Sequence, residues 1–183
     1  ILAAILLLVL KSISMTDVYE AINWPVIFLI ALLIPIGTAM ENTGAANFLS
    51  DFIITFVEEM NIDPQLKINY VISILYFITF LTSAFISNAA VAIILSPLAI
   101  LLSNHFQITN PDIALDPTRA FLMSICFGAS ASFMTPIGYQ TNLMVFGPGQ
   151  YKFKDFLIVG LPLTIIFWLV ASYFIPIYWP IIK

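Results

Sequence analysis

Neutral oxygen and amide groups interrupt the apolar runs of this sequence at two places. The first is the Ser87-Asn88 pair within "ISNAAV", residues 86–91. The second is "TPIGYQTN", residues 135–142, which joins a proline and a glycine to a tyrosine, a glutamine, two threonines and an asparagine. Hard cations bind oxygen ligands, and the oxygens available here are neutral. The two interruptions therefore favour a weakly held monovalent cation such as sodium over a proton or a transition metal.

The same two interruptions also suit an anion. A helix that begins after Asn88 would offer free backbone amides and the positive end of its dipole. In the second interruption, Pro136 removes a helix donor. Gly138 permits a backbone dihedral closed to other residues and lets a ligand approach the main chain. These features together predict a ligand site, and a simple proline kink is the alternative.

The composition places the chain in a membrane. Apolar residues make up 61% of the 183 residues and charged residues only 9%, and the mean hydropathy is +1.05. A soluble domain carries roughly 25% charged residues. We therefore expect an all-α, polytopic integral membrane protein surrounded by membrane lipid. The net charge of −4 says little about partners because most charges must lie in loops, and no nucleic acid partner is expected.

The first interruption divides a long uncharged run. Residues 68–104 contain no charged side chain, and this run is too long for one span of about 20 residues. A turn exposed to water usually shows glycine, proline or charge, whereas this run offers only Ser87 and Asn88. The pattern predicts a re-entrant hairpin over 67–104 with its tip buried at membrane depth. Two full spans joined by a tight surface turn are the alternative.

Other segments are expected to position the second interruption. A broken transmembrane helix is predicted over 119–147, and the last transmembrane helix over 156–178. Residues 45–60 alternate apolar and polar side chains at helical spacing, which predicts an interfacial helix. Residues 25–40 form a further span, and residues 1–10 the end of another.

Discontinuous helices near the bilayer midplane are typical of secondary transporters. A channel or pore-forming membrane subunit is the alternative, because a broken helix can also form a filter. An enzyme is not expected, since Gly-x-Ser-x-Gly and His-Glu-x-x-His motifs are absent from the sequence. The predicted membrane segments contain no aspartate or glutamate, which are the residues that usually carry protons across a membrane.

Three stretches resemble the divalent anion/sodium symporters, the dicarboxylate, sulfate and citrate carriers with a citrate transporter-like domain. They are "INWPVIFLIALLIPIGTAMENTGAA", "SNA" at the predicted hairpin tip, and "SFMTPIGYQTNLMVFGPGQYKFKDFLIVGLPL". The family has two inverted repeats, each with a hairpin and a broken helix. The resemblance implies that residues 1–183 are the second repeat, the C-terminal half of the transmembrane domain, and that the N-terminal repeat lies elsewhere in the protein.

The resemblance also implies a function. The protein would be a symporter that carries a small anion, sulfate-like or a di- or tricarboxylate, by secondary active transport. Sodium would be the coupling ion, and the mechanism would be alternating access. We further expect a homodimer with multiple membrane passes in a plasma or inner membrane. No cofactor, no catalytic residue and no metal other than sodium is expected.

The resemblance assigns site residues from both interruptions. Sodium would be bound by side-chain and main-chain oxygens of Ser83, Ser87, Asn88, Pro136 and Gly138. The anion would be bound by Ser87, Asn88, Ala89, Tyr139, Gln140, Thr141 and Asn142.

Two departures from the family pattern bear on the substrate. Ala89 stands where the hairpin tip commonly has a threonine, and this removes a hydroxyl expected to meet a carboxylate. Tyr139, Gln140 and Thr141 stand where the dicarboxylate carriers commonly have Thr-Pro-Pro. Both departures weaken the expectation of a carboxylate substrate, and the second is similar to sulfate-type carriers.

Overall fold

The computed structural model confirms the expected fold class. It describes residues 6, 10, 14–22, 24–60, 62–109 and 116–181, and within these residues all regular structure is helical. Three of the described helices, α5 (Pro64–Ser83), α6 (Asn88–Thr109) and α9 (Phe153–Tyr178), are long and apolar enough to cross a membrane. The span end expected at residues 1–10 lies almost wholly outside the described residues.

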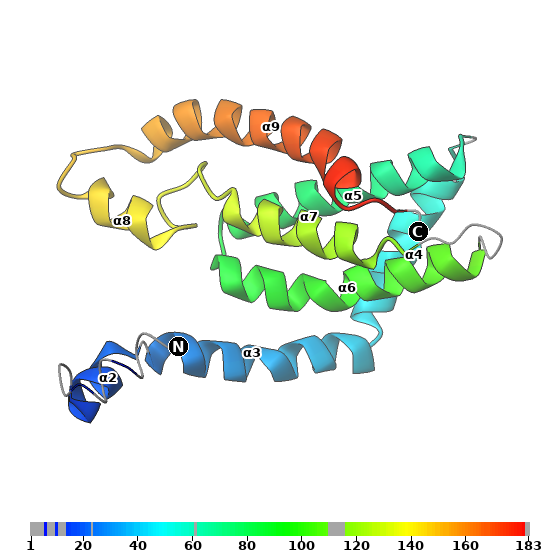
Figure 1. Ribbon diagram of the computed structural model, residues 1–183. Helices are drawn as coiled ribbons and strands as arrows, with labels where there is room; N and C mark the ends of the chain where they lie inside the picture. Colours follow the sequence, from blue (N-terminus) through cyan, green and yellow to red (C-terminus); the bar gives the residue numbers. More distant parts are fainter. Residues whose placement is uncertain are drawn as a thin grey trace.

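The long helices run roughly side by side in layers (Figure 1). In that view α3 (Trp24–Asn42) lies beneath α6, α6 lies beneath α5 and α7 (Thr118–Ser130), and α9 covers the opposite side. One helix, α4 (Ala45–Glu58), runs across this direction and packs on α3, α5 and α6. A helix that crosses the others suits the position expected for an interfacial helix, which stays a prediction.

Local signals in the sequence explain where several helices begin. The short helix α2 (Met15–Ala21) starts with a capping box between Ser14 and Asp17. The hydrogen bonds that Ser14 donates, first from its backbone and then from its hydroxyl, lower the pKa of the Asp17 carboxyl below its usual value. Helix α5 begins at a proline, and its N-cap Asp63 accepts a hydrogen bond from the Gln65 amide.

The core lies where α5 and α7 pack closely. At Gly128 of α7, an added Cβ would lie 2.9 Å from the Tyr76 carbonyl oxygen and 2.9 Å from the Thr79 Cβ on α5. The small-residue run "FGASAS" therefore serves close helix packing, as small residues do in membrane helices. Phe121 and Ile125 on the same helix are fully buried within this core.

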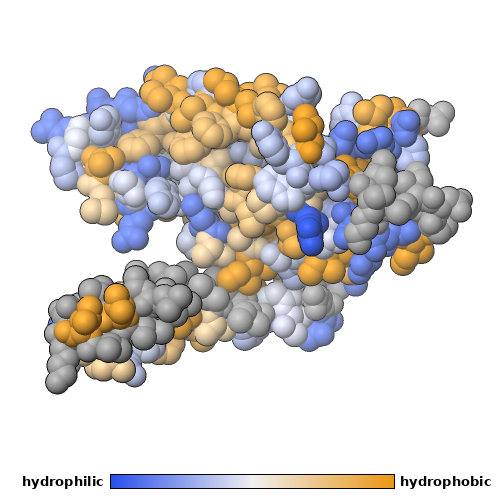
Figure 2. Space-filling model, viewed as in Figure 1, coloured by the Kyte–Doolittle hydropathy of each residue, from blue (hydrophilic) through white to orange (hydrophobic). Residues whose placement is uncertain are grey.

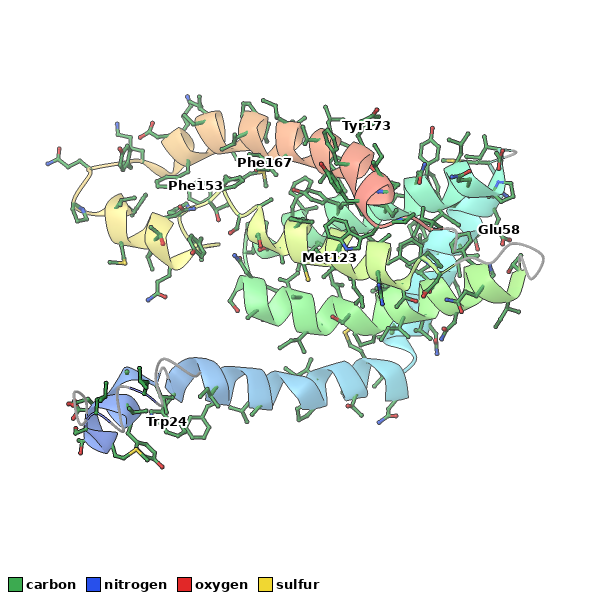
Figure 3. The ribbon with its side chains drawn as sticks, in the orientation of Figure 1. Trp24, Glu58, Met123, Phe153, Phe167 and Tyr173 are labelled. Atoms are coloured by element: carbon green, nitrogen blue, oxygen red, sulfur yellow. The ribbon has the colours of Figure 1, made fainter. Side chains whose placement is uncertain are left out.

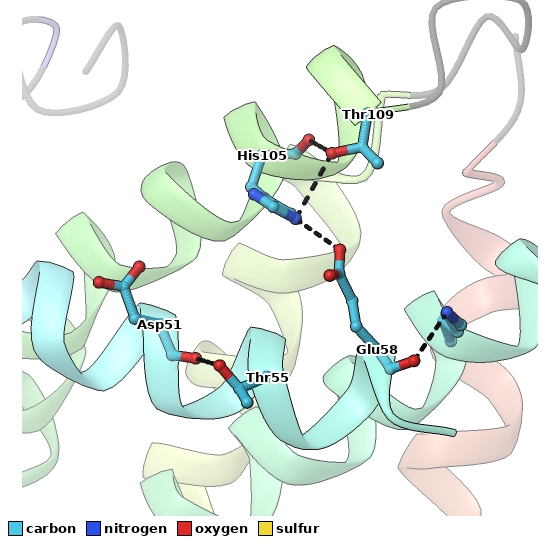
Figure 4. Close-up of polar contacts among 6 residues, drawn as sticks. Asp51, Thr55, Glu58, His105 and Thr109 are labelled. Atoms are coloured by element: carbon cyan, nitrogen blue, oxygen red, sulfur yellow. Dashed lines mark hydrogen bonds and ion pairs between the residues drawn. The ribbon is translucent and has the colours of Figure 1, made fainter. Parts of the chain in front are cut away.

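At one end of the bundle, α4 is tied to α6 by a polar contact. Glu58 Oε1 lies 3.0 Å from His105 Nε2, and both side chains are partly exposed (Figure 4). Lys67 on α5 donates to the Glu58 carbonyl oxygen at 3.4 Å. Charged contacts therefore gather at this end, which we call the charged end.

The opposite end holds both interruptions. Residues 84–87 join α5 to α6, and residues 131–139 separate α7 from α8 (Gln140–Phe146). The hairpin helices extend beyond the expected range of 67–104 at both ends, and α9 begins three residues before the expected 156. The broken helix falls within the expected 119–147 apart from one residue at its start.

Helix α9 exposes apolar side chains along most of its length, and the surface over it is largely hydrophobic (Figure 2). Its first residues extend past the hairpin tip. Gly160, the eighth residue of α9, packs on the break at Phe133. At 1.5 Å per residue, the break therefore lies about 10 Å inward from the start of α9. That the hairpin tip lies at membrane depth stays a prediction.

Candidate functional site

A cluster of neutral oxygens joins the hairpin tip to the break. Asn88 begins α6, and its side-chain oxygen accepts from the Ser83 hydroxyl at 2.8 Å and from the Ser132 hydroxyl at 3.1 Å. The Ser83 hydroxyl oxygen also lies 2.6 Å from the Ala129 carbonyl oxygen. Ser83 is fully buried, and Ser132 is 3% exposed. We call Ser83, Asn88, Ala129 and Ser132 the oxygen cluster.

The Ser83 hydroxyl contacts two oxygens of the oxygen cluster. Asn88 Oδ1 and the Ala129 carbonyl both lie within hydrogen-bond distance of it. All oxygens of the cluster are neutral, and neutral oxygens can contact a cation through their lone pairs.

Thr135 fixes the break to the hairpin tip beside this cluster. Its hydroxyl donates to the Ala84 carbonyl oxygen and accepts from the Gly138 amide at 3.0 Å. The Thr135 side chain is 2% exposed. A single buried side chain therefore satisfies one main-chain group of the tip and one of the break, as irregular backbone inside a membrane protein requires.

Gly138 is required for a different reason from the one expected. Its φ is not in the left-handed region, so the expectation of a dihedral closed to other residues is wrong. An added Cβ would instead lie 2.7 Å from the Ser83 carbonyl oxygen and 3.1 Å from that of Ala84. The glycine allows the break to approach the carbonyl end of α5, because a side chain at this position would collide with backbone.

Asn142 closes the break from the side of α8. Its amide nitrogen donates to the Ser132 carbonyl at 3.0 Å and to the Thr135 carbonyl at 3.1 Å. Both N–H groups of the amide are thereby engaged with the main chain. Asn142 therefore holds the main chain of the break in place. Its expected contact with an anion stays a prediction.

Helix α9 supports the break from behind. An added Cβ at Gly160 would lie 2.1 Å from the Phe133 carbonyl oxygen and 2.8 Å from the Met134 Cα. The main chain between Ser132 and Thr135 therefore rests directly on the α9 backbone. Phe167, on the same side of α9, packs its ring 5.4 Å from that of Phe133 (Figure 3).

The other predicted residues face outward. Ser87 at the hairpin tip is exposed, and so are Gln140 and Thr141. Tyr139 is half exposed, and Ala89 is partly buried. The space-filling view shows the molecule hollowed between the part that carries α8 and the part that carries α2 and α3 (Figure 2). We call the exposed residues Ser87, Tyr139, Gln140 and Thr141 the open side, and their contact with an anion stays a prediction.

Comparison with known proteins gives the family. A sequence model described as citrate transporter matches residues 1–117. The chain belongs to the citrate transporter family. An uncharacterised transporter of Synechocystis is 41% identical over 82% of this chain and 22% of its own length. A probable sodium/sulfate cotransporter of Chlamydomonas reinhardtii is 31% identical over 94% of this chain and 18% of its own length. An uncharacterised transporter of Escherichia coli is 29% identical over 98% of this chain and 27% of its own length.

The family and these relatives are transporters rather than enzymes, as expected from the sequence, and the chain is that of an integral membrane protein. The chain spans only about a fifth to a quarter of the length of these curated relatives. The resemblance to the divalent anion/sodium symporters, which carry the citrate transporter-like domain, is thereby confirmed.

The site of this citrate transporter family member differs in part from the residues expected. The structure brings Ser83, Asn88 and Gly138 together, and it buries Pro136 within the break. Sequence reasoning missed Ser132, Thr135 and the Ala129 carbonyl. Ser132 ends the run "FGASAS", residues 127–132, and small residues in a membrane helix are typical of close packing, so this pattern did not mark Ser132 as a ligand. The signal for Thr135 was its position directly before Pro136, because a proline disfavours the helical conformation of the residue before it.

Proposed function

We propose that the protein is a sodium-coupled secondary transporter of a small anion that works by alternating access, and that this chain supplies one half of its binding region. The observation that carries this proposal is the oxygen cluster, in which Asn88 Oδ1 accepts from hydroxyls of the hairpin and of the break. An ion held there would contact both interrupted helices at once, so its binding would depend on how the hairpin and the broken helix are placed.

Sodium fits the donor set better than a proton. Ser83, Asn88, Ser132 and the Ala129 carbonyl offer only neutral oxygens, and none of them titrates near neutral pH. The names of three Chlamydomonas relatives include sodium as the coupling ion, which supports the same choice.

For the anion, we propose a compact oxyanion such as sulfate. The relatives named sodium/sulfate cotransporters support this choice. Two features of this chain support it as well: Ala89 provides no hydroxyl at the tip, and the side chains of Tyr139, Gln140 and Thr141 are exposed. The family name points instead to citrate. We assign the anion contacts to Ser87, Asn88 and the exposed residues 139–141. We assign the sodium contacts to the oxygen cluster, together with main-chain oxygens near Pro136 and Gly138.

The remaining parts of the proposal concern the whole protein. The other half of the binding region would come from a first repeat outside this chain, which the greater length of the relatives allows. We propose that the complete protein crosses a plasma or inner membrane several times and forms a homodimer. Three spans among the described helices of this chain alone support the multiple crossings.

The test is uptake of radiolabelled sulfate into proteoliposomes that contain the full-length protein. We expect saturable uptake that needs an inward sodium gradient, that potassium does not replace, and that changes little between about pH 6 and 8, well above the pKa of an unperturbed carboxyl group. Unlabelled sulfate should compete better than citrate. Uptake driven by a pH gradient without sodium would contradict sodium coupling. Flux that is linear in substrate and indifferent to sodium would indicate a pore.

A further inference from the structure

An apolar pocket lies between α9 and the pair formed by α5 and α7 (Figure 1). It has a volume of about 640 Å³, and no basic or acidic side chain lines it. Its aromatic walls include Phe127, Phe133, Phe167 and Phe174. Sites for small molecules are typically hollows of about 300–1,000 Å³, lined by apolar and aromatic side chains with a few polar groups. The pocket therefore has the size and the lining of a site for an apolar molecule.

One hydroxyl in the wall of this pocket has no partner. Tyr76 of α5 lines the pocket and is only 1% exposed. Its hydroxyl makes no hydrogen bond with any of the described residues. Among the described residues, Asn69 Oδ1 is the buried side-chain atom that is both sealed and unpaired. The unpaired Tyr76 hydroxyl is therefore not sealed, and its small exposed area opens to the pocket.

Buried hydroxyls elsewhere on these three helices are paired. Those of Thr79 on α5, Ser124 on α7 and Thr164 on α9 each donate to a carbonyl oxygen of their own helix. Tyr76 cannot do so, because its ring holds the hydroxyl far from its own backbone. An unpaired buried hydroxyl destabilises the protein, and the hydrocarbon of a membrane offers it no partner. A molecule bound in the pocket would supply the missing partner.

The polar groups of the lining favour a neutral carbonyl. The Tyr76 hydroxyl can donate a hydrogen bond. Trp179, which lines the pocket just beyond α9, has an indole N–H that can only donate and that is not hydrogen-bonded within the described part of the chain. A charged ligand would be buried without a counter-charge, which is costly. A flat ring, in contrast, can pack against the aromatic walls.

We propose that this pocket binds a membrane quinone, a flat neutral ring with two carbonyl oxygens that is soluble in hydrocarbon. The Tyr76 hydroxyl donates to one carbonyl, and the ring lies among the aromatic side chains of α7 and α9. An acyl chain could fill the pocket but would leave Tyr76 unpaired. Ester carbonyls stay near the headgroups, whereas Tyr76 lies about 18 Å along α5 from Pro64. This inference does not depend on sodium coupling or on the anion.

The experiment titrates the full-length protein, purified in detergent, with dimethylnaphthoquinone. Its two methyl groups occupy the ring positions that thiols attack, so the exposed Cys126 on α7 does not react with it. Dimethylnaphthalene has the same rings without the carbonyls and is the matched probe. We expect the quinone to raise the midpoint of thermal unfolding saturably. The hydrocarbon should need a concentration at least about fivefold higher, as one lost hydrogen bond implies.

Tyr76→Phe removes the hydroxyl and keeps the ring. The quinone concentration for half of the rise in midpoint should increase by about fivefold, whereas that of dimethylnaphthalene should stay as it is. Tyr70→Phe is the matched control, because Tyr70 lies on the same helix, is 48% exposed and does not line the pocket. It should leave both titrations unchanged.

A second variant tests the place of the ligand without touching Tyr76. Val170 lines the pocket from α9 and is 48% exposed, so Val170→Trp can fill the pocket without disturbing the core. It should weaken the binding of both probes. Equal titrations of the unchanged protein with the two probes, or no saturable rise with the quinone, would overturn the proposal. Quinone binding that is unaffected by Tyr76→Phe or by Val170→Trp would overturn it as well, because the quinone would then lie elsewhere.

Discussion

The two sides of the break between α7 and α8 use the same kinds of residue in opposite ways. On the side of α7, Ser132 and Thr135 are 3% and 2% exposed, and each donates to the hairpin tip. On the side of α8, Gln140 and Thr141 are exposed. The buried side is fixed before any ligand arrives, whereas the open side can adjust to one. A preorganised side suits selection of the sodium cation. A side that can adjust suits binding of the anion.

The largest effect is expected at Asn88 Oδ1, the atom at which the hairpin and the break meet. Asn88→Ala removes the oxygen that accepts from Ser83 and from Ser132. We expect sodium-dependent uptake to fall by more than about tenfold. The proposed cation loses one oxygen ligand and the buried Ser132 hydroxyl loses its acceptor, at about 1 kcal/mol or more each. Expression and membrane insertion should stay near those of the unchanged protein. Loss of folded protein in detergent would mean that Asn88 stabilises the fold, and it would contradict the role assigned to Asn88 at the cation site.

The second effect tests whether the buried side depends on support from α9. Gly160→Ala would push the main chain at Phe133 away by about 1 Å, because its Cβ would otherwise lie 2.1 Å from the carbonyl oxygen. We expect the sodium concentration for half-maximal uptake to rise by about tenfold, since binding geometry tolerates about 0.5 Å. Half-saturation by the anion should change less.

One control and one milder variant accompany Gly160→Ala. Gly147→Ala adds a Cβ that meets no atom within 4 Å, and uptake should be unaffected. Phe167→Leu loosens the contact with Phe133 without a collision and should act in the same direction as Gly160→Ala, but less. If Gly160→Ala folds and keeps its sodium response, α9 does not position the break.

A smaller effect is expected from a single ligand. Ser132→Ala deletes one hydroxyl of the oxygen cluster, and loss of about 1 kcal/mol corresponds to about a fivefold rise in the sodium concentration for half-maximal uptake. Ser130→Ala is a matched control, because the Ser130 hydroxyl is exposed and donates within its own helix to the Cys126 carbonyl at 2.9 Å. Equal effects of the two variants would remove Ser132 from the cation site.

The smallest effect separates the two sides of the break. Thr141→Val replaces an exposed hydroxyl with a methyl group of similar size. We expect the sulfate concentration for half-maximal uptake to rise by about threefold to fivefold, which corresponds to one lost hydrogen bond. The sodium dependence should stay as it is. A shift in sodium dependence without a shift for sulfate would reverse the roles assigned to the two sides.

The sequence determined the class of the protein and the places where its helices break. Both follow from local information: long uncharged runs identify membrane helices, and proline, glycine and neutral polar residues mark their ends. The hairpin turn at residues 84–87 and the interval 131–139 between α7 and α8 overlap the interruptions expected at 86–91 and 135–142, and each begins a few residues earlier. The sequence also singled out Asn88, an amide inside an apolar run, and the structure shows it hydrogen-bonded to Ser83 and Ser132, whereas its contact with an ion stays a prediction.

Only the tertiary structure decided which atoms meet. Ser83 and the Ala129 carbonyl are 46 residues apart, and Ser132 lies 44 residues from Asn88. Nothing in the local pattern distinguished Ser132 from Ser130, although one faces the hairpin and the other faces away. Likewise, the need for glycine at position 138 comes from the approach of another segment, and not from its own backbone conformation. Such contacts depend on how the helices pack, and packing is a property of the whole chain.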